Sequence, residues 1–467
     1  MSPRLRALRG VGEDLMTRSA LGVVALLLVA GAAVAVGMAR CEGTPPSVET
    51  ASPLAIGADA RAVTVEVADG GAGVRSLRAT LVHAGGEAPL SEREFGGSLL
   101  PYLGSHSERE RVDLSIDAKA LGLASGDAKL RLTARDLSWR DFGRGNEVIV
   151  EVPVTIDYRP PSISLAPGIT YAKRAGSVAL VYDVSDDTER DGVEVGDRFY
   201  PSLPVSGEGV PAGRRFALFP LAQELLSDVK IAVVAVDQAG NRSSRTPQIN
   251  IKDRVYRNET IVLSQRFLDQ KVADLASATG VNDSDKLKAF QEINTRIRRE
   301  NEERIRSIIA ESTPEPLFSE AFEQMPDSQV MSTFAERRSY LLDENKVSES
   351  IHYGYDLASL AGSPIPASNK GRVIFADELG IYGNCVILDH GLGLHSLYGH
   401  LSNIDVKAGD TVEKGQTLGQ SGQTGLAGGD HLHFAILLRG VYVDPVEWWD
   451  PKWVREHALG PLATARK

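Results

Sequence analysis

The 467-residue sequence predicts a multidomain, mainly β chain with an N-terminal transmembrane helix, two β-sandwich modules, a helical connector and a C-terminal all-β domain. Three observations indicate this order: an uncharged apolar run at residues 20–39, alternating apolar and polar runs up to residue 255, and a region rich in glycine and histidine after residue 329. At about 100–200 residues per domain, the length suggests about three domains besides the membrane segment.

The apolar run at residues 20–39 predicts the transmembrane helix. It is rich in Leu, Val and Ala, and its length matches the roughly 30 Å of hydrocarbon in a bilayer. Four arginines lie within residues 1–19, whereas only Arg40 follows closely, so the positive-inside bias places the N-terminus in the cytoplasm. We expect a single-pass protein of the inner (cytoplasmic) membrane, with the remaining chain periplasmic or extracellular. Small residues between Ala30 and Ala35 leave signal cleavage and secretion as the alternative.

The chain contains two cysteines, Cys41 and Cys385, so no disulfide framework is expected. Cys41 follows the apolar run, but lipidation is not expected because Arg40, and not a small residue, precedes it. Cys385 lies in an apolar run, and we expect a buried thiol there because free cysteine is among the most buried residue types.

Two pairs of similar segments indicate consecutive structural units. The run PPSV at residues 45–48 recurs as PPSI at residues 160–163. The run LTARD at residues 132–136 is followed about a hundred residues later by VVAVD at residues 233–237, within the usual spacing of small β modules. Both pairs place the second unit directly after the first.

Alternating apolar residues, as at residues 62–67 and 178–184, indicate strands joined by polar, glycine-rich turns. We therefore expect immunoglobulin-like β-sandwiches at residues 44–158 and 159–255. Their aspartates and asparagines are expected to make turns, with calcium binding as the less favoured alternative. These modules could also bind a regulatory protein.

Residues 262–326 are expected to form a helical connector. Their apolar residues recur mostly at steps of three and four among arginines and glutamates, which predicts an amphipathic helix with Asp283 as its N-cap. The apolar positions are Leu287, Phe290, Ile293, Ile297, Ile305 and Ile308. The charged run at residues 296–306 is expected to be a solvated face, and prolines after residue 313 mark the way into the next domain. Nucleic-acid binding is not suggested, because the formal net charge is −11 and basic residues alternate with acidic ones.

Histidines are concentrated near the C-terminus, since six of the nine lie between His352 and His433. A catalytic zinc takes three protein ligands and keeps a fourth position for water. His431 and His433 are two residues apart at the start of a predicted strand at residues 432–438, so their side chains should share one face. One of them can therefore hold a metal while the other transfers protons.

Seven stretches carry a family resemblance. They are HYGYD (352–356), YGN (382–384), LDHG (388–391), YGHLS (398–402), VEKGQ (412–416), GQSGQTG (419–425) and HLHF (431–434). In their order and spacing, residues 329–450 resemble the lysostaphin or LytM-type zinc metallopeptidases, which have the duplicated hybrid motif fold and cut peptide bonds in bacterial peptidoglycan. Residues 451–467 are expected to be a tail.

The resemblance implies one Zn²⁺ in the catalytic domain, with His352, Asp356 and His433 as ligands and His400 and His431 as the unligated catalytic pair. It also implies a peptidoglycan stem or cross-bridge peptide as substrate. Relatives that have lost ligands act as activators of other cell-wall enzymes, so this intact set favours catalysis. Ala435 departs from the glutamate common in the family, and we expect only a local packing difference there.

The remaining histidines of this region have other expected roles. His390 lies in a turn between two strand-like runs and is expected to be structural. His395 lies on the next strand and is expected to be exposed or to line a groove.

Two hypotheses remain open besides catalysis alone. The chain could be a catalytically silent, membrane-anchored scaffold that binds peptidoglycan and recruits or activates another hydrolase. The connector could also lie across the catalytic groove and inhibit the enzyme, or it could be a spacer packed only on the second sandwich. A zinc-independent adhesin would leave the clustered histidines unexplained.

Overall fold

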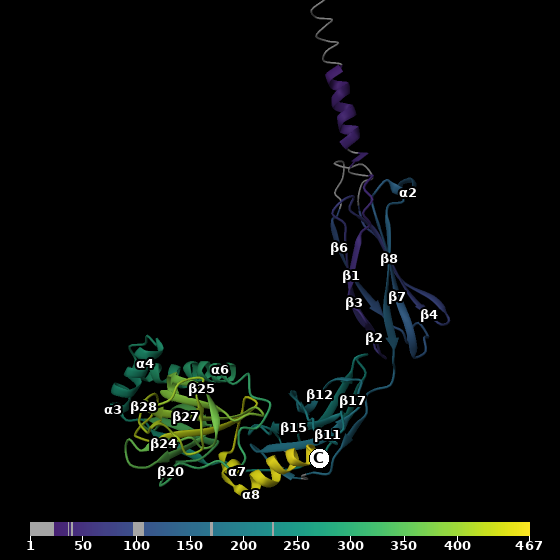
Figure 1. The fold of residues 1–467 in the computed structure, drawn as a ribbon. Coiled ribbons are helices and arrows are strands. Elements are labelled where there is room, and N and C mark those ends of the chain that lie inside the picture. Colours follow the sequence, from purple (N-terminus) through teal and green to yellow (C-terminus); the bar gives the residue numbers. More distant parts are fainter. Residues whose placement is uncertain (1–22, 36, 39–40, 97–106, 169–170, 227) are drawn as a thin grey trace, which may run out of the picture. The chain divides into compact units, whose positions relative to one another are not determined.

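The computed structural model describes residues 23–35, 37–38, 41–96, 107–168, 171–226 and 228–467 (Figure 1). It is mainly β, with several small sheets and few helices. The chain divides into two compact units: Met1–Pro160 with Val236–Arg242, and Pro161–Ala235 with Ser243–Lys467.

The expected membrane segment lies only partly within the described residues. Residues 23–35 and 37–38 are helical, whereas residues 20–22, 36 and 39 lie outside the described residues. In the part of the chain that is described, no helix combines the length and the apolar composition needed to cross a membrane. The transmembrane helix therefore stays a prediction.

The first sandwich consists of two sheets around one core. The smaller sheet has the order β1-β3-β6, and the larger has the order β2-β8-β7-β4-β5. The strands are β1 (Ser47–Thr50), β2 (Leu54–Ile56), β3 (Arg61–Ala68), β4 (Val74–His83), β5 (Gly86–Glu94), β6 (Arg109–Ile116), β7 (Gly126–Asp136) and β8 (Glu147–Ile156), with the short helix α2 (Arg140–Gly143) before β8. Because side chains alternate along a strand, β3 and β7 each bury every second residue in the shared core.

Aspartates at the ends of two strands make turns, as expected from the sequence. Asp136 ends β7 and accepts the backbone N–H groups of Ser138 at 2.9 Å and Asn146 at 2.7 Å. Asp237 accepts the backbone N–H of Asn241 at 2.9 Å and its side-chain amide at 2.9 Å. These bonds satisfy backbone donors where the sheet ladder stops.

The second sandwich also has two sheets around a core of its own. Their orders are β14-β15-β11-β9 and β13-β12-β16-β17, and a parallel pair joins β10 to β18. The strands are β9 (Ile163–Leu165), β10 (Tyr171–Lys173), β11 (Ser177–Val184), β12 (Thr188–Val195), β13 (Arg198–Pro201), β14 (Leu203–Pro204), β15 (Arg214–Pro220), β16 (Ile231–Asp237), β17 (Arg242–Arg245) and β18 (Asn250–Lys252). The immunoglobulin-like topology of both modules stays a prediction.

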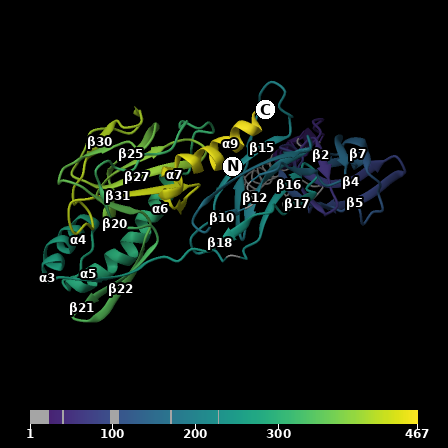
Figure 2. The same cartoon turned by 90° about the horizontal axis from the view of Figure 1, so that it is seen from below.

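Strand β11 is buried on both faces, because the end of the chain covers its outer face. Helix α7 (Pro445–Trp449) precedes the expected tail at residues 451–467, which is helical, with α8 (Pro451–Trp453), a π-helical segment (Val454–Leu459) and α9 (Gly460–Ala465). Helix α9 packs on β11 and β15 (Figure 2). Glu447 accepts the N–H of Ser177 at 2.9 Å, and the Trp448 indole donates to the Ser177 hydroxyl at 3.2 Å. The outer faces of β11 and β15 therefore belong to the hydrophobic core of the C-terminal domain, besides the sandwich's own core.

The C-terminal domain is built on an eight-stranded sheet with the path β20-β23-β31-β27-β26-β25-β29, in which β32 also pairs with β31. A small sheet, β24-β30-β28, accompanies it. The strands are β20 (Gln329–Ser332), β23 (Tyr355–Ala358), β24 (Pro364–Pro366), β25 (Gly371–Glu378), β26 (Asn384–Asp389), β27 (Leu394–Leu401), β28 (Asn403–Ile404), β29 (Thr411–Val412), β30 (Thr417–Gln420), β31 (Leu432–Leu438) and β32 (Val441–Val443).

A third sheet, β19-β21-β22, joins the expected connector to this domain. Strand β19 (Asn258–Val262) runs parallel to β21 (Glu336–Leu342), which forms a hairpin with β22 (Asn345–His352). The helical elements between β19 and β20 are α3 (Gln265–Phe267), a π-helical segment (Leu268–Val272), α4 (Ala273–Thr279), α5 (Lys286–Glu292), a second π-helical segment (Ile293–Ile297) and α6 (Arg298–Ile308).

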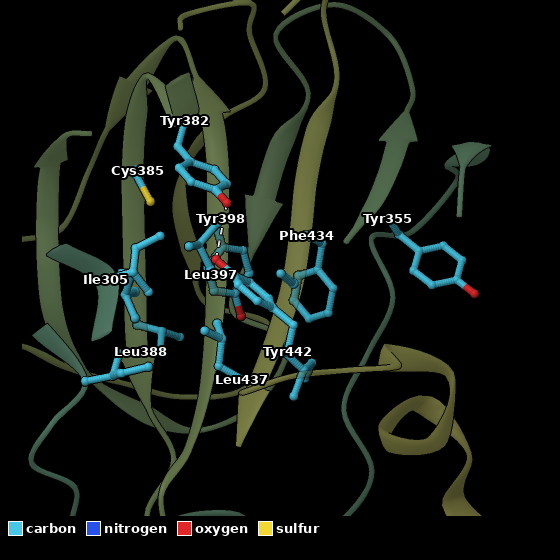
Figure 3. Close-up of a cluster of buried hydrophobic side chains, with 14 of the residues drawn as sticks. Ile305, Tyr355, Tyr382, Cys385, Leu388, Leu397, Tyr398, Phe434, Leu437 and Tyr442 are labelled. Atoms are coloured by element: carbon cyan, nitrogen blue, oxygen red, sulfur yellow. Dashed lines mark hydrogen bonds between the residues drawn. The ribbon is translucent and has the colours of Figure 1, made fainter. Parts of the chain in front are cut away.

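The predicted apolar stripe of this helical segment packs in the core of the C-terminal domain. Phe290, Ile293, Ile297 and Ile305 are buried, and Leu287 and Ile308 are half-buried. Figure 3 shows Ile305 of α6 in the same cluster as Cys385 and Leu397. A spacer packed only on the second sandwich is therefore wrong.

The predicted N-cap is shifted by two residues. Asp285 caps α5 by accepting the N–H groups of Leu287 at 3.0 Å and Lys288 at 3.3 Å, whereas Asp283 accepts the N–H of Asp285 at 2.8 Å. Asp283 thus satisfies a donor before the helix, whereas Asp285 satisfies two donors of its first turn.

The charged run is solvated for the most part, as predicted. Arg296 forms ion pairs with Glu292 at 2.6 Å and Glu300 at 2.8 Å, four residues away on either side. Glu302 departs from this pattern, because it turns inward and accepts a hydrogen bond from the Tyr382 hydroxyl at 2.6 Å.

Replacement of Ile305 by alanine should lower the free energy of unfolding by about 2–5 kcal/mol, because a fully buried side chain leaves a cavity in the shared core. Urea unfolding of the whole chain, followed by tryptophan fluorescence, measures the change. The exposed neighbour Ser307, replaced by alanine, is the matched control and should leave the midpoint nearly unchanged. Equal stability of the two variants would contradict a connector built into the core.

Candidate metal centre

Three side chains from three strands meet at one point in the C-terminal domain. His352 ends β22, Asp356 lies in β23 and His433 lies in β31. His352 Nε2 lies 2.9 Å from Asp356 Oδ1 and 3.0 Å from His433 Nδ1, and the last two atoms are 3.0 Å apart. The three residues are only 5%, 8% and 4% exposed. The structure thus brings together the three predicted ligands.

Strand register explains part of this convergence. Asp356 is directly paired with His433 across β23 and β31, and directly paired residues project from the same face of a sheet. Gly354 lies between His352 and Asp356, and a Cβ there would come within 2.6 Å of His433 Cε1 and of the Phe434 carbonyl oxygen. Glycine is therefore required for the close approach of the turn to the His433 ring.

Backbone carbonyls fix the orientation of three of the four histidines at this point. The Nδ1 atoms of His352, His400 and His431 face the carbonyl oxygens of Thr333, Thr424 and Gly429 at 3.1, 2.8 and 2.9 Å, respectively. An Nδ1–H donated to a carbonyl leaves Nε2 as the free lone pair, so each ring presents Nε2 for chemistry. His433 is different, because its Nδ1 faces the centre and its buried Nε2 has no hydrogen-bond partner among the described residues.

His400 reaches the centre through an unusual backbone conformation. Its neighbour Gly399 is paired with His433, so regular alternation would point His400 to the opposite face of the sheet. His400 instead has a φ of +67°, and its ring centroid lies 5.8 Å from that of His433. The left-handed conformation costs a non-glycine residue roughly 1–2 kcal/mol. Backbone strain of this kind clusters at functional sites.

His431 completes the group from the residue before β31, where it forms an isolated bridge with Gly422. Its ring centroid lies 4.8 Å from that of His400, and its Nε2 lies 3.5 Å from Asp356 Oδ1. His400 and His431 therefore lie together beside the three converging side chains, as the sequence predicted.

The buried carboxylate and imidazoles influence one another electrostatically. Burial tends to raise the pKa of Asp356, but the neighbouring histidines, His352 first among them, bring that pKa well below its usual range. Burial lowers the pKa of His433 to about 4 and the pKa of His400 well below its ordinary value. Burial acts in the same direction on His431, but the Asp356 carboxylate outweighs it and raises the pKa of His431.

A zinc ion fits this group of atoms. Two imidazole nitrogens and a carboxylate oxygen are ligands that zinc accepts, with bonds of about 2.0–2.2 Å. Tetrahedral coordination with such bonds separates neighbouring ligand atoms by roughly 3.3 Å, close to the 2.9–3.0 Å observed. The ionised Asp356 and the neutral His433 are also the protonation states that a metal ion binds.

The centre opens into a cleft of about 1030 Å³. His352, Asp356, His400, His431 and His433 line it, and residues of α3 and the following π-helical segment form part of the wall. Lys271 of that segment donates a hydrogen bond to the carbonyl oxygen of Gln423. The helical segment therefore borders the cleft, and autoinhibition by it stays a prediction.

The other residues of interest lie away from the cleft. His390 is buried and bonded through Nδ1 to the Lys370 carbonyl oxygen at 2.7 Å and through Nε2 to the Ser396 hydroxyl at 2.7 Å, which confirms its structural role. Burial lowers its pKa to about 4. Cys385 is buried as predicted, and burial raises the pKa of its thiol.

The expectation for His395 is wrong. Its side chain is 0% exposed and lies 3.6 Å from the buried carboxylate of Asp389. Residues 312–313 cover this end of the sheet, where Ser312 and Thr313 donate hydrogen bonds to Asp389. A segment far away in the sequence thus lies against the carboxylate beside His395, at a place that strand alternation does not reveal.

The sequence did not single out several residues that support the centre. Arg338 donates a hydrogen bond to Asp356 Oδ2 at 2.8 Å, and the Tyr382 ring lies 5.4 Å from that of His433. Figure 3 shows the hydroxyl groups of Tyr382 and Tyr442 pointing toward one another, at 3.2 Å. Tyr382 belongs to a recognised motif, but no spacing rule connects Arg338 to the centre, because the hairpin register decides which side chain reaches it.

The C-terminal domain is similar in sequence to known proteins. Residues 350–445 match the family described as peptidase family M23. The chain is 37% identical over 123 residues to peptidoglycan DD-endopeptidase ShyA of Vibrio cholerae, covering 26% of this chain and 28% of that protein. It is 34% identical over 105 residues to stage II sporulation protein Q of Bacillus subtilis, covering 22% of this chain and 37% of that protein. The matched segment therefore spans less than two thirds of either relative.

Among solved structures, the catalytic domain of the antimicrobial peptidase lysostaphin from Staphylococcus simulans is similar to this chain at 28% identity. The match covers 28% of this chain and 98% of that domain, with a TM-score of 0.24.

Replacement of Gly354 by alanine should weaken zinc binding by roughly ten- to a hundredfold, because the added Cβ displaces the His433 ring. Competition with a chromogenic chelator measures the affinity. Gly428 lies in the same cleft with open space around its Cβ position, so Gly428→Ala is the matched control. A folded Gly354→Ala protein with wild-type zinc affinity would show that this contact is unimportant.

Proposed function

Residues 350–445 form a domain of peptidase family M23, of the LytM/lysostaphin type, and from this we propose that the chain is a zinc-dependent metalloendopeptidase acting on peptidoglycan. It would hydrolyse peptide bonds in stem or cross-bridge peptides. The observation that carries the proposal is the meeting of His352 Nε2, Asp356 Oδ1 and His433 Nδ1 within 3.0 Å, beside two further histidines. The printed name of ShyA, a peptidoglycan DD-endopeptidase, supports the choice of substrate.

His352, Asp356 and His433 would hold the zinc ion. When bound, zinc supplies a Lewis acid for the peptide carbonyl and makes a water molecule acidic at neutral pH. Thr333 and Arg338 would keep two of the ligands in place through the Thr333 carbonyl bond to His352 and the guanidinium bond to Asp356. These contacts let the centre form before substrate arrives.

His400 and His431 would move protons. Both rings are anchored through Nδ1, so Nε2 of one can accept a proton from the attacking water and deliver it to the leaving amine. The other ring can donate a hydrogen bond to the carbonyl oxygen as negative charge develops on it. The shared anchoring is compatible with either assignment of the two roles.

The proposed location is the outer side of the cytoplasmic membrane. The arginines before residue 20 and the apolar run at residues 20–39 support anchoring by a single helix, with the catalytic domain facing the periplasm or the exterior. Secretion after signal cleavage is the alternative. The two sandwiches are the surfaces that we propose for a regulatory protein partner.

A second candidate function is a catalytically silent, peptidoglycan-binding scaffold. Its support is the similarity over 105 residues to stage II sporulation protein Q, whose printed name is not that of a peptidase. A scaffold would not need zinc or turnover, so metal content and cleavage of cell-wall material separate the two functions.

The full chain incubated with purified peptidoglycan sacculi should release peptide-cleaved products that mass spectrometry of the muropeptides identifies. Removal of zinc by a chelator should abolish the release, and added zinc should restore it.

His352→Ala, Asp356→Ala and His433→Ala should lose zinc and activity together, because each change removes one ligand. His83→Ala, in the first sandwich, is the control. A chain without zinc or cleavage would support the scaffold, and full zinc retention in His433→Ala would refute the ligand assignment.

His400→Ala and His431→Ala should retain zinc but lose turnover by roughly a hundredfold or more, since proton transfer and charge stabilisation each contribute on this scale. Zinc content by atomic absorption and initial rates on a defined muropeptide give the two readouts. A variant that cleaves at the wild-type rate would show its histidine to be structural.

A further inference from the structure

The two carboxylate oxygens of Asp356 have different partners, and Arg338 binds one of them. Asp356 Oδ1 lies 2.9 Å from His352 Nε2 and 3.0 Å from His433 Nδ1, and therefore faces the proposed zinc position. Asp356 Oδ2 accepts a hydrogen bond from Arg338 Nη2 at 2.8 Å. The Arg338 side chain is 17% exposed, so water competes little for this bond. Charge-assisted bonds of this kind are strong and directional.

The hairpin β21–β22 holds Arg338 in place. Arg338 and Glu336 are two residues apart on β21 and share a face, with Arg338 Nε 3.9 Å from Glu336 Oε2. Glu336 is 1% exposed, and its Oε1 accepts the backbone N–H of Thr333 at 2.9 Å. Glu336 is also paired with His352 across the hairpin. The same hairpin thus positions the ligand His352 and the partner of the ligand Asp356.

We propose that Arg338 is a positioning residue that restricts Asp356 to metal binding through Oδ1 alone. A carboxylate can bind a metal ion through one oxygen or through both. If Oδ2 were free, it would compete for the coordination position that a catalytic zinc must leave open for water. By occupying Oδ2, Arg338 keeps that position available. This inference rests on the proposed function, because it requires a metal ion at the centre.

Arg338 also lines the cleft, so binding of a substrate carboxylate is a competing role. The two roles predict different effects of substitution. A positioning residue changes the coordination of the metal in the absence of substrate and lowers kcat, whereas a substrate-binding residue leaves the free metal centre unchanged and raises KM.

Cobalt(II) reports coordination directly, because four-coordinate cobalt absorbs visible light much more strongly than five- or six-coordinate cobalt. The full chain would be loaded with Co²⁺ alone, without substrate, as wild type, Arg338→Met, Arg338→Lys and the control Arg337→Met. Arg337 is exposed and directly precedes Arg338 on the same strand. Circular dichroism verifies the fold of each variant.

We expect Arg338→Met to show a several-fold weaker visible band per bound cobalt, with kcat lowered roughly ten- to a hundredfold and KM little changed. Arg338→Lys keeps a cationic donor and should stay near wild type even if Arg338→Met folds poorly, and Arg337→Met should match wild type. An unchanged cobalt band in folded Arg338→Met, with or without a higher KM, overturns the inference. If the wild-type chain itself binds no Co²⁺ or Zn²⁺, the proposed function fails and the inference falls with it.

Discussion

Lone pairs that face one another at about 3 Å are the constraint on which this centre depends. Because the Thr333 carbonyl takes the Nδ1–H of His352, the Nε2 lone pair of that ring points at Asp356 Oδ1 and His433 Nδ1. Such atoms repel in a buried setting unless a proton or a cation lies between them. Glycine at position 354 leaves room for the His433 ring, and the guanidinium of Arg338 holds Asp356 in place, so the atoms stay close despite this repulsion.

Residues outside the segment that matches the family also support the metal centre. Arg338 and Thr333 precede residue 350, and Glu302 of α6 accepts a hydrogen bond from Tyr382, whose ring lies beside His433. Helix α6 also contributes Ile305 to the common core. A fragment that begins at residue 329 would keep the ligands but remove these helical contacts, so it would not isolate inhibition from loss of folding.

The sequence predicted features that lie within one short motif or strand. It did not predict contacts between segments that are far apart in the chain. The resemblance carried by the short motifs at residues 352–356, 398–402 and 431–434 implied the residues of the centre, because each motif stays on one strand or turn. Alternation located strands such as β3 and β11. Ser312 and Thr313 bond to Asp389 beside the buried His395, and Arg338 reaches Asp356 through hairpin register, so no local pattern contained either arrangement.

The covering of β11 by the end of the chain has a consequence for folding. Ser177 at the start of β11 bonds to Glu447, 270 residues later, and α9 packs still further along the chain. Because the chain is synthesised from its N-terminus, the apolar outer face of β11 is made long before helix α9, which covers it. Contacts of such long sequence separation form slowly. The outer face of β11 is therefore completed only when the last helix of the chain has formed.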